Sequence, residues 1–271
     1  MRCVYVDLDG TLLGPRASLL SGSGGEFSLL GVRALEACHR AGVEVVIYSG
    51  RRERSVFEAA RLIGSAAFIF ELGCGLVLDG ELEWLTDGLE PSTELGTIHD
   101  QIEASGAPGL LLERYPGQLE YHTPWAANRE VSHLFRGLVD LREANALLAD
   151  AGYSLRLVDN GVVRAASEQM RGLPAVHAYH LVPAGASKAR GVARHMQARG
   201  YTPDDVIAVG DSREDMDAAS VVSTFWLVAN AIERDPTLEA EASGRPGVRL
   251  AGESYGAGVY EAVVTTLAER R

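Results

Sequence analysis

The stretch Val4-Tyr5-Val6-Asp7-Leu8-Asp9-Gly10-Thr11 combines a short apolar run with two carboxylates, a glycine and a hydroxyl. The apolar run predicts a buried β-strand, and Gly10 permits the tight turn that ends it. An aspartate at a strand end can attack phosphorus, but its charge repels a phosphate group unless a cation lies between them. Asp7 is therefore a candidate nucleophile, although an acidic turn after a buried strand is the ordinary alternative.

The composition is that of a soluble globular protein, with 46% hydrophobic and 23% charged residues. A length of 271 residues suits one large domain or two smaller ones. The formal charge of -12 comes from 37 acidic and 25 basic residues, without a run of lysine and arginine. This charge argues against nucleic acid or an anionic membrane as a partner and leaves the oligomeric state open.

The three cysteines, Cys3, Cys38 and Cys74, are widely spaced and lie in apolar segments. We expect buried thiols without a disulfide, as in a reducing compartment. The first strand begins almost at Met1, which leaves no room for a signal peptide, and no apolar run approaches the ~20 residues of a membrane span. The expected location is the cytoplasm.

The first part of the chain alternates between helical and strand patterns. Apolar residues recur at helical spacing from Leu30 to Cys38, and the run Val43 to Tyr48 is rich in β-branched residues. The segments 53–63 and 67–70 repeat this helix and strand. Strands of this kind, reached through helices, indicate a doubly wound, parallel-sheet (Rossmann-like) α/β core.

From about Asp79 the pattern changes to short strands and turns. Pro116-Gly117 suits the centre of a turn, so residues 110–115 and 118–123 are predicted as an antiparallel hairpin. Its register would place Glu113, Glu120 and His122 on one polar face. A long helix is predicted from about residue 131 to 151.

Beyond Pro183 the alternation returns, with helices at 187–199 and 214–220, strands at 206–209 and 224–228, and a final helix ending near Arg270. We therefore predict a discontinuous core, residues 1–79 and 183–271, with an inserted α+β cap domain, residues 80–182.

Polar residues follow the predicted core strands at the edge where ligands of parallel sheets bind. They are Asp7 and Asp9, then Ser49-Gly50-Arg51, then Asp211 with Asp215, and Lys188 at the start of a helix. Asp7 would be the nucleophile and Asp9 a proton shuttle, while Ser49 and Lys188 would contact phosphoryl oxygens. Asp211 would hold magnesium, and Asp215 would bind a metal water or steady Lys188. Taken singly, Ser49 fits an ordinary helix cap and Lys188 a solvated side chain.

Four segments together resemble the motifs of the haloacid dehalogenase superfamily of phosphatases. They are Asp7-Leu8-Asp9-Gly10-Thr11, Tyr48-Ser49-Gly50-Arg51, Ala186-Ser187-Lys188-Ala189 and Gly210-Asp211-Ser212-Arg213-Glu214-Asp215. The insertion resembles the class II, type B cap of members that act on phosphorylated sugars. The resemblance implies an aspartyl-phosphate mechanism, with magnesium bound by Asp7, Asp211 and the Asp9 carbonyl. It departs at Glu214, where asparagine is common.

The candidate substrate contacts in the core are Thr11, Gly50, Arg51 and Asn230, although Asn230 also fits a loop turn. In the cap, Glu113, Glu120 and His122 are candidates for sugar hydroxyls and Arg164 for a further anion, with a solvated face as the alternative. His177 and His180 fit packed or surface histidines better than metal ligands.

The sequence thus predicts a magnesium-dependent phosphatase for a small phosphorylated metabolite, most simply a sugar or polyol phosphate. Two alternatives stay open, namely a phosphomutase on a sugar phosphate and a non-catalytic protein that binds a phosphorylated metabolite.

Overall fold

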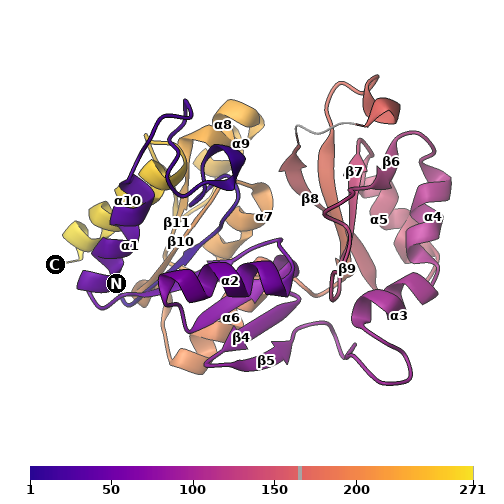
Figure 1. The fold of residues 1–271 in the computed structure, drawn as a ribbon, viewed down its shortest axis with the longest axis horizontal. Helices are drawn as coiled ribbons and strands as arrows, with labels where there is room; N and C mark the ends of the chain where they lie inside the picture. Colours follow the sequence, from indigo (N-terminus) through magenta and orange to yellow (C-terminus); the bar gives the residue numbers. More distant parts are fainter. Residues whose placement is uncertain (164–166, 271) are drawn as a thin grey trace. The chain divides into compact units, whose positions relative to one another are not determined.

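The computed structural model describes residues 1–163 and 167–270 (Figure 1). The chain divides into two compact units. The core unit comprises Met1–Glu83 and Ser187–Arg271, and the cap unit comprises Trp84–Ala186. The cap unit is thus an insertion in the sequence of the core unit, and the crossings predicted at Asp79 and Pro183 lie just before the observed divisions.

The core unit is built on one sheet, which has eight strands among the described residues, in the order β12-β11-β10-β1-β2-β3-β4-β5. The strands from β12 to β3 pair in parallel, and β4 runs antiparallel to β3. Their bounds are β1 Cys3–Val6, β2 Glu44–Tyr48, β3 Ala67–Phe70, β4 Gly75–Leu78, β5 Glu81–Trp84, β10 Val206–Gly210, β11 Thr224–Leu227 and β12 Val248–Leu250. The predicted doubly wound α/β class is confirmed.

Helices connect the parallel strands of this sheet, as expected for right-handed crossovers. The helices that precede or join these strands are α1 Leu30–Arg40, α2 Glu53–Ile63, α6 Lys188–Arg199, α7 Arg213–Met216, α8 Ala229–Arg234 and α9 Thr237–Ser243, and α10 Tyr255–Glu269 follows the last strand. Helices α1 and α10 pack closely through two glycines, since a Cβ on Gly256 would lie 2.8 Å from the Cα of Gly31. The hairpin of β4 and β5, helix α9 and strand β12 were not predicted.

The cap unit contains a four-stranded antiparallel sheet, in the order β6-β7-β9-β8 within the described part of the unit. The strands are β6 Leu119–Tyr121, β7 His133–Gly137, β8 Leu155–Val162 and β9 His177–Pro183, and the helices are α3 Ile98–Ala104, α4 Ala107–Arg114 and α5 Leu141–Asp150. An α+β insertion is therefore present, as predicted.

Two predictions within the cap were wrong. Residues 107–114 form helix α4 and not a hairpin strand, because Pro108 lies in the first turn, where its fixed φ suits a helix. The long helix predicted from Val131 is replaced by β7, which pairs with both β6 and β9, and by α5, which begins after its N-cap Asp140. Short apolar runs do not distinguish a buried strand from a helix by periodicity alone.

The correction to α4 also changes the predicted polar face. Glu113 is an exposed residue of α4, so it does not share a sheet face with Glu120 and His122. Arg164 lies outside the described residues. None of the helices in the described ranges combines the length and the apolar character that a bilayer span requires.

Candidate active site

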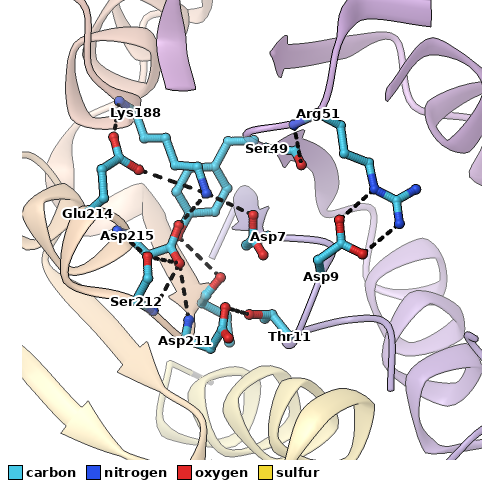
Figure 2. A network of polar contacts seen from close by, with 12 residues as sticks. Asp7, Asp9, Thr11, Ser49, Arg51, Lys188, Asp211, Ser212, Glu214 and Asp215 are labelled. Atoms are coloured by element: carbon cyan, nitrogen blue, oxygen red, sulfur yellow. Dashed lines mark hydrogen bonds and ion pairs between the residues drawn. The ribbon is translucent and has the colours of Figure 1, made fainter. Parts of the chain in front are cut away.

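The carboxyl edge of the core sheet collects the polar residues that the sequence singled out (Figure 2). Asp7 follows β1, Ser49 follows β2 and Asp211 follows β10, while Lys188 is the first residue of α6. The backbone N–H of Asp7 donates to the carbonyl of Val209, which keeps the ends of β1 and β10 level. Parallel pairing thus brings segments from both ends of the chain to one place.

Lys188 lies at the centre of this cluster and is buried. Its Nζ donates to Oδ1 of Asp7 over 2.8 Å and to Oδ1 of Asp215 over 2.5 Å. The ammonium also lies 4.9 Å from the ring centroid of Tyr48, within the range of a cation–π contact. Burial alone would lower the pKa of Lys188, but the adjacent carboxylates raise it, so the side chain stays an ammonium.

Asp7 is a buried carboxylate with a lysine on one side and further acids on the other. Burial raises the pKa of the Asp7 carboxyl, and the Lys188 ammonium opposes that rise. Donor oxygens of Asp7, Asp211 and Asp215 lie within 4.8 Å of one another. Buried carboxylates at this spacing repel each other, so the cluster favours a cation besides Lys188. A set of carboxylate oxygens fits magnesium, which prefers oxygen donors.

The oxygens of Asp215 are engaged by the protein itself. Oδ1 accepts from Lys188, and Oδ2 accepts from the backbone N–H groups of Asp211 and Ser212 and from the Ser212 hydroxyl over 2.7 to 3.2 Å. Of the two roles considered for Asp215, this geometry favours steadying Lys188 over binding a metal water.

Asp211 is held in place by two neighbours. The Thr11 hydroxyl donates to its Oδ1 over 3.0 Å, and the Arg234 guanidinium contacts its Oδ2. Thr11 is fully buried, so its geometry favours orienting Asp211 over contacting a substrate. Gly10 makes room for this carboxylate, because a Cβ there would lie 2.2 Å from Oδ2 of Asp211, and its φ of +89° suits glycine.

Glu214 departs from the usual motif but has a structural role here. Its Oε1 accepts from the backbone N–H of Lys188 over 2.9 Å, at the N-terminus of α6. A carboxylate at this position satisfies a free N–H group and interacts favourably with the helix dipole. Glu214 thereby fixes the residue from which the Lys188 side chain extends.

Asp9 is exposed and lies beside Arg51. Nε and Nη2 of Arg51 donate to the two carboxylate oxygens of Asp9 over 2.5 and 2.6 Å. Burial would lower the pKa of Arg51, but these hydrogen bonds raise it. Ser49 is buried and its hydroxyl accepts from the Arg51 N–H, with the buried Gly50 between them. Arg51 therefore orients the proposed proton shuttle.

Asn230 is buried, and both ends of its amide are used. Nδ2 donates to the carbonyl of Gly10 and Oδ1 accepts from the N–H of Tyr255, each over 2.8 Å. This geometry favours a role in positioning the Asp9-Gly10 turn over a direct contact with substrate.

In the cap unit, the predicted candidate His122 has two arginines near it, Arg129 and Arg136, that the sequence did not single out. Burial lowers the pKa of His122, and Arg136 and Arg129 add to the effect. Arg136 pairs with Glu120 over 2.6 Å. His177 pairs with Asp159, and His180 lies 3.2 Å from the Ser132 hydroxyl, which agrees with their interpretation as packed histidines.

The known proteins to which this chain is similar are phosphatases and related hydrolases. No family model matches. A phosphoglycolate phosphatase from Halorubrum lacusprofundi is 28% identical over 227 residues, 83% of each chain, and one from Methanoculleus marisnigri is 24% identical over 97% of this chain and 95% of its own. The solved sucrose-phosphatase from Synechocystis, in complex with sucrose and phosphate, superposes with a TM-score of 0.67 at 15% identity over 98% of both chains.

A haloacid dehalogenase-like hydrolase from Bacteroides thetaiotaomicron superposes with a TM-score of 0.59 at 16% identity, over 97% of this chain and 98% of its own. A doubly wound sheet that carries a buried aspartate, a lysine and further acids at its carboxyl edge, and that is interrupted by a cap unit, suits a phosphoryl-transfer enzyme. The chain is thus similar in sequence to phosphoglycolate phosphatases and shares its fold with a haloacid dehalogenase-like hydrolase, and these comparisons support a phosphatase with an inserted cap unit.

Proposed function

We propose that this phosphatase is magnesium-dependent and releases phosphate from a small phosphorylated metabolite through an aspartyl-phosphate on Asp7. The observation that carries the proposal is the Asp7 carboxylate, held beside the buried Lys188 ammonium at the sheet edge. A nucleophile fixed next to a permanent cation is suited to attack on a phosphate anion.

The reaction has two steps. An oxygen of Asp7 attacks phosphorus, the bond to the leaving oxygen breaks, and Asp9 donates a proton to that oxygen. In the second step Asp9 takes a proton from water, which attacks the aspartyl-phosphate and releases inorganic phosphate. Arg51 orients Asp9 through two hydrogen bonds to its carboxylate oxygens.

Asp7 and Asp211, with the Asp9 carbonyl, would hold the magnesium ion. The ion supplies positive charge that offsets repulsion between the carboxylates and the phosphate group. Asp215 and Glu214 act on Lys188, through its ammonium and its backbone N–H respectively. Ser49 supplies a hydroxyl to a phosphoryl oxygen.

A sugar or polyol phosphate is the first substrate class to test, and the solved sucrose-phosphatase supports it. A phosphorylated hydroxy acid such as phosphoglycolate is the second, because the curated relatives bear that name. The buried thiols support a cytoplasmic location.

The decisive experiment compares the wild type with Asp7→Asn for phosphate release from p-nitrophenyl phosphate in the presence of magnesium. The variant should be folded by circular dichroism and inactive, whereas an active variant would remove Asp7 as the nucleophile. A panel of sugar phosphates, polyol phosphates and phosphoglycolate then ranks the substrate classes by kcat/KM. Isomerised product in place of free phosphate would indicate a mutase, and binding without turnover would indicate a binding protein.

A further inference from the structure

A second cluster of potential metal ligands lies in the core unit at the amino ends of the strands, away from the carboxyl edge. Cys3 begins β1, Glu44 begins β2, and the two residues are direct partners in the register. His195 reaches them from α6, and one ligand atom from each residue lies within 4.8 Å of the others. The donors are a sulfur, a carboxylate oxygen and an imidazole nitrogen, a combination typical of zinc sites.

The His195 ring is fixed in the orientation that a metal ligand needs. Its Nδ1 lies 2.8 Å from the Tyr5 hydroxyl, and the whole side chain is buried. Its Nε2 has no hydrogen-bond partner among residues 1–163 and 167–270, and Oε1 of Glu44 is 3.7 Å away. A buried nitrogen without a partner is costly, and metal-binding histidines characteristically have the other nitrogen hydrogen-bonded.

Glu44 is an oriented carboxylate. The Tyr201 hydroxyl donates to its Oε2 over 2.9 Å and the Arg199 guanidinium to its Oε1 over 3.1 Å. These two donors hold the carboxylate in place, as the outer shell of a metal site does.

The local charge also suits a divalent cation. Arg199 is shared between two carboxylates, since it binds Asp79 through two hydrogen bonds of 2.7 and 2.8 Å besides its contact with Glu44. The two acids exceed this arginine by one negative charge. A Cys3 thiolate adds a second, so a divalent ion would bring the group to neutrality.

Cys3 is fully buried and lies directly opposite Glu44 in the sheet register. A zinc ion displaces the thiol proton when it binds, because the ligand is the thiolate.

We propose that Cys3, Glu44 and His195 form a zinc-binding site, with water in the fourth position of a tetrahedral ion. The site is separate from the proposed catalytic centre and does not depend on the proposed reaction. It would join β1, β2 and α6, the helix that begins with Lys188. Its expected effect is stabilisation of the core unit by a bound ion.

Cobalt(II) provides a direct probe, because a cobalt–thiolate bond gives a charge-transfer absorption that oxygen donors do not give. Metal-free protein, prepared with a chelator, is titrated with cobalt(II) with magnesium in excess, and zinc is then added in competition. We expect the band to appear with one equivalent of cobalt and zinc to remove it. The melting temperature with zinc should also rise. No band and no zinc-dependent shift in the wild type would overturn the proposal.

Variants assign the ligands. Cys3→Ser should abolish the band, and His195→Gln should weaken zinc binding by more than about 10-fold, the smallest effect usual for an outer-shell partner. Tyr5→Phe, which loses only the hydroxyl next to His195, should weaken binding about 10-fold. The matched control is Cys38→Ser, a second buried thiol, which should keep the band. A band that survives Cys3→Ser, or disappears in Cys38→Ser, would refute the assignment.

Discussion

The ammonium of Lys188 lies 2.8 Å from a carboxylate oxygen of Asp7, although 181 residues separate them in the sequence. Lys188 also faces Asp215, so one buried cation is placed between two buried carboxylates. Removing one member of such a group leaves the others without compensation in a medium of low dielectric constant.

Lys188→Met should therefore lower both stability and activity. The free energy of unfolding should fall by about 3 to 5 kcal/mol, the cost of a buried pair that loses one partner. Turnover should fall by at least about 100-fold, because the transition state loses a fixed positive charge. Urea unfolding and the p-nitrophenyl phosphate assay measure the two effects. Arg190→Gln, on an exposed residue of the same helix, is the control, and equal stability of both variants would contradict the prediction.

Asn230→Ala should slow turnover by displacing the turn at Gly10. The substitution removes the donor to the Gly10 carbonyl and the acceptor for the Tyr255 N–H, at a cost of about 1 to 3 kcal/mol in stability. Asn230→Asp keeps the acceptor and loses the donor, so it isolates the contact to Gly10. We expect both variants to lose kcat. Wild-type kcat in Asn230→Asp would show that the Gly10 contact does not matter for catalysis.

Magnesium removal should stop turnover, and added magnesium should restore it. Asp211→Asn should raise the magnesium concentration for half-maximal activity strongly, because a charged donor is lost. Thr11→Val, which removes only the hydroxyl that orients Asp211, should raise it about 10-fold, as for an outer-shell partner. Titrations of activity and of magnesium binding by calorimetry test the order of the two variants. An unchanged requirement in Asp211→Asn would exclude this residue as a ligand.

Acidification should destabilise the cap unit through His133. Burial lowers the pKa of His133 from 6.5 to about 4, and the stacked His99 adds to the effect. Above the pKa of His133 in the unfolded protein, the imidazole is neutral in both the folded and the unfolded state, so its burial costs no stability. As the pH falls from 6.5 towards 4 only the unfolded state binds the proton, so stability is lost by at most about 3 kcal/mol.

Urea unfolding at several pH values between 4 and 6.5 should show that the free energy of unfolding decreases as the pH falls. His133→Gln should make this pH dependence weaker. His39→Gln, on an exposed residue of α1, should leave it unchanged. Glu103, with Oε2 3.3 Å from Nδ1 of His133, favours the protonated form and partly opposes the effect of burial on the pKa. A pH dependence that is the same in the wild type and His133→Gln would assign the effect to other groups.

The core was predictable because its signals are local and repeated. The strands β1, β2 and β10 are apolar, β-branched runs followed by polar residues, and helices such as α1 have an apolar stripe of their own, whereas the short strand β12 lacks this signal. The cap was less predictable. Helix α4 and strand β7 are both short and apolar, and only their neighbours decide which conformation they take. The hairpin of β4 and β5 has the same difficulty.

Some residues of the candidate site could be predicted from the sequence, and the contacts of others could not. Residue type and position in the predicted fold singled out Asp7, Asp9 and Asp211 after strands and Lys188 at the start of a helix, and the structure brings Lys188 into contact with Asp7. Nothing near Glu214 in the sequence indicates that it receives the N–H of Lys188, and nothing near Asn230 indicates that it holds Gly10. Both contacts join segments that are distant in the sequence, and their partners are backbone atoms, which are the same in every residue.

The amino-acid sequence by itself determined the doubly wound core, the insertion and the order of the charged residues along the sheet edge, because period, turn chemistry and residue type are local properties. Tertiary structure decided which carboxylate steadies the lysine, which side chains are withdrawn from a ligand, and that Cys3, Glu44 and His195 meet. These outcomes depend on distance and burial, and both arise only when separate segments pack together.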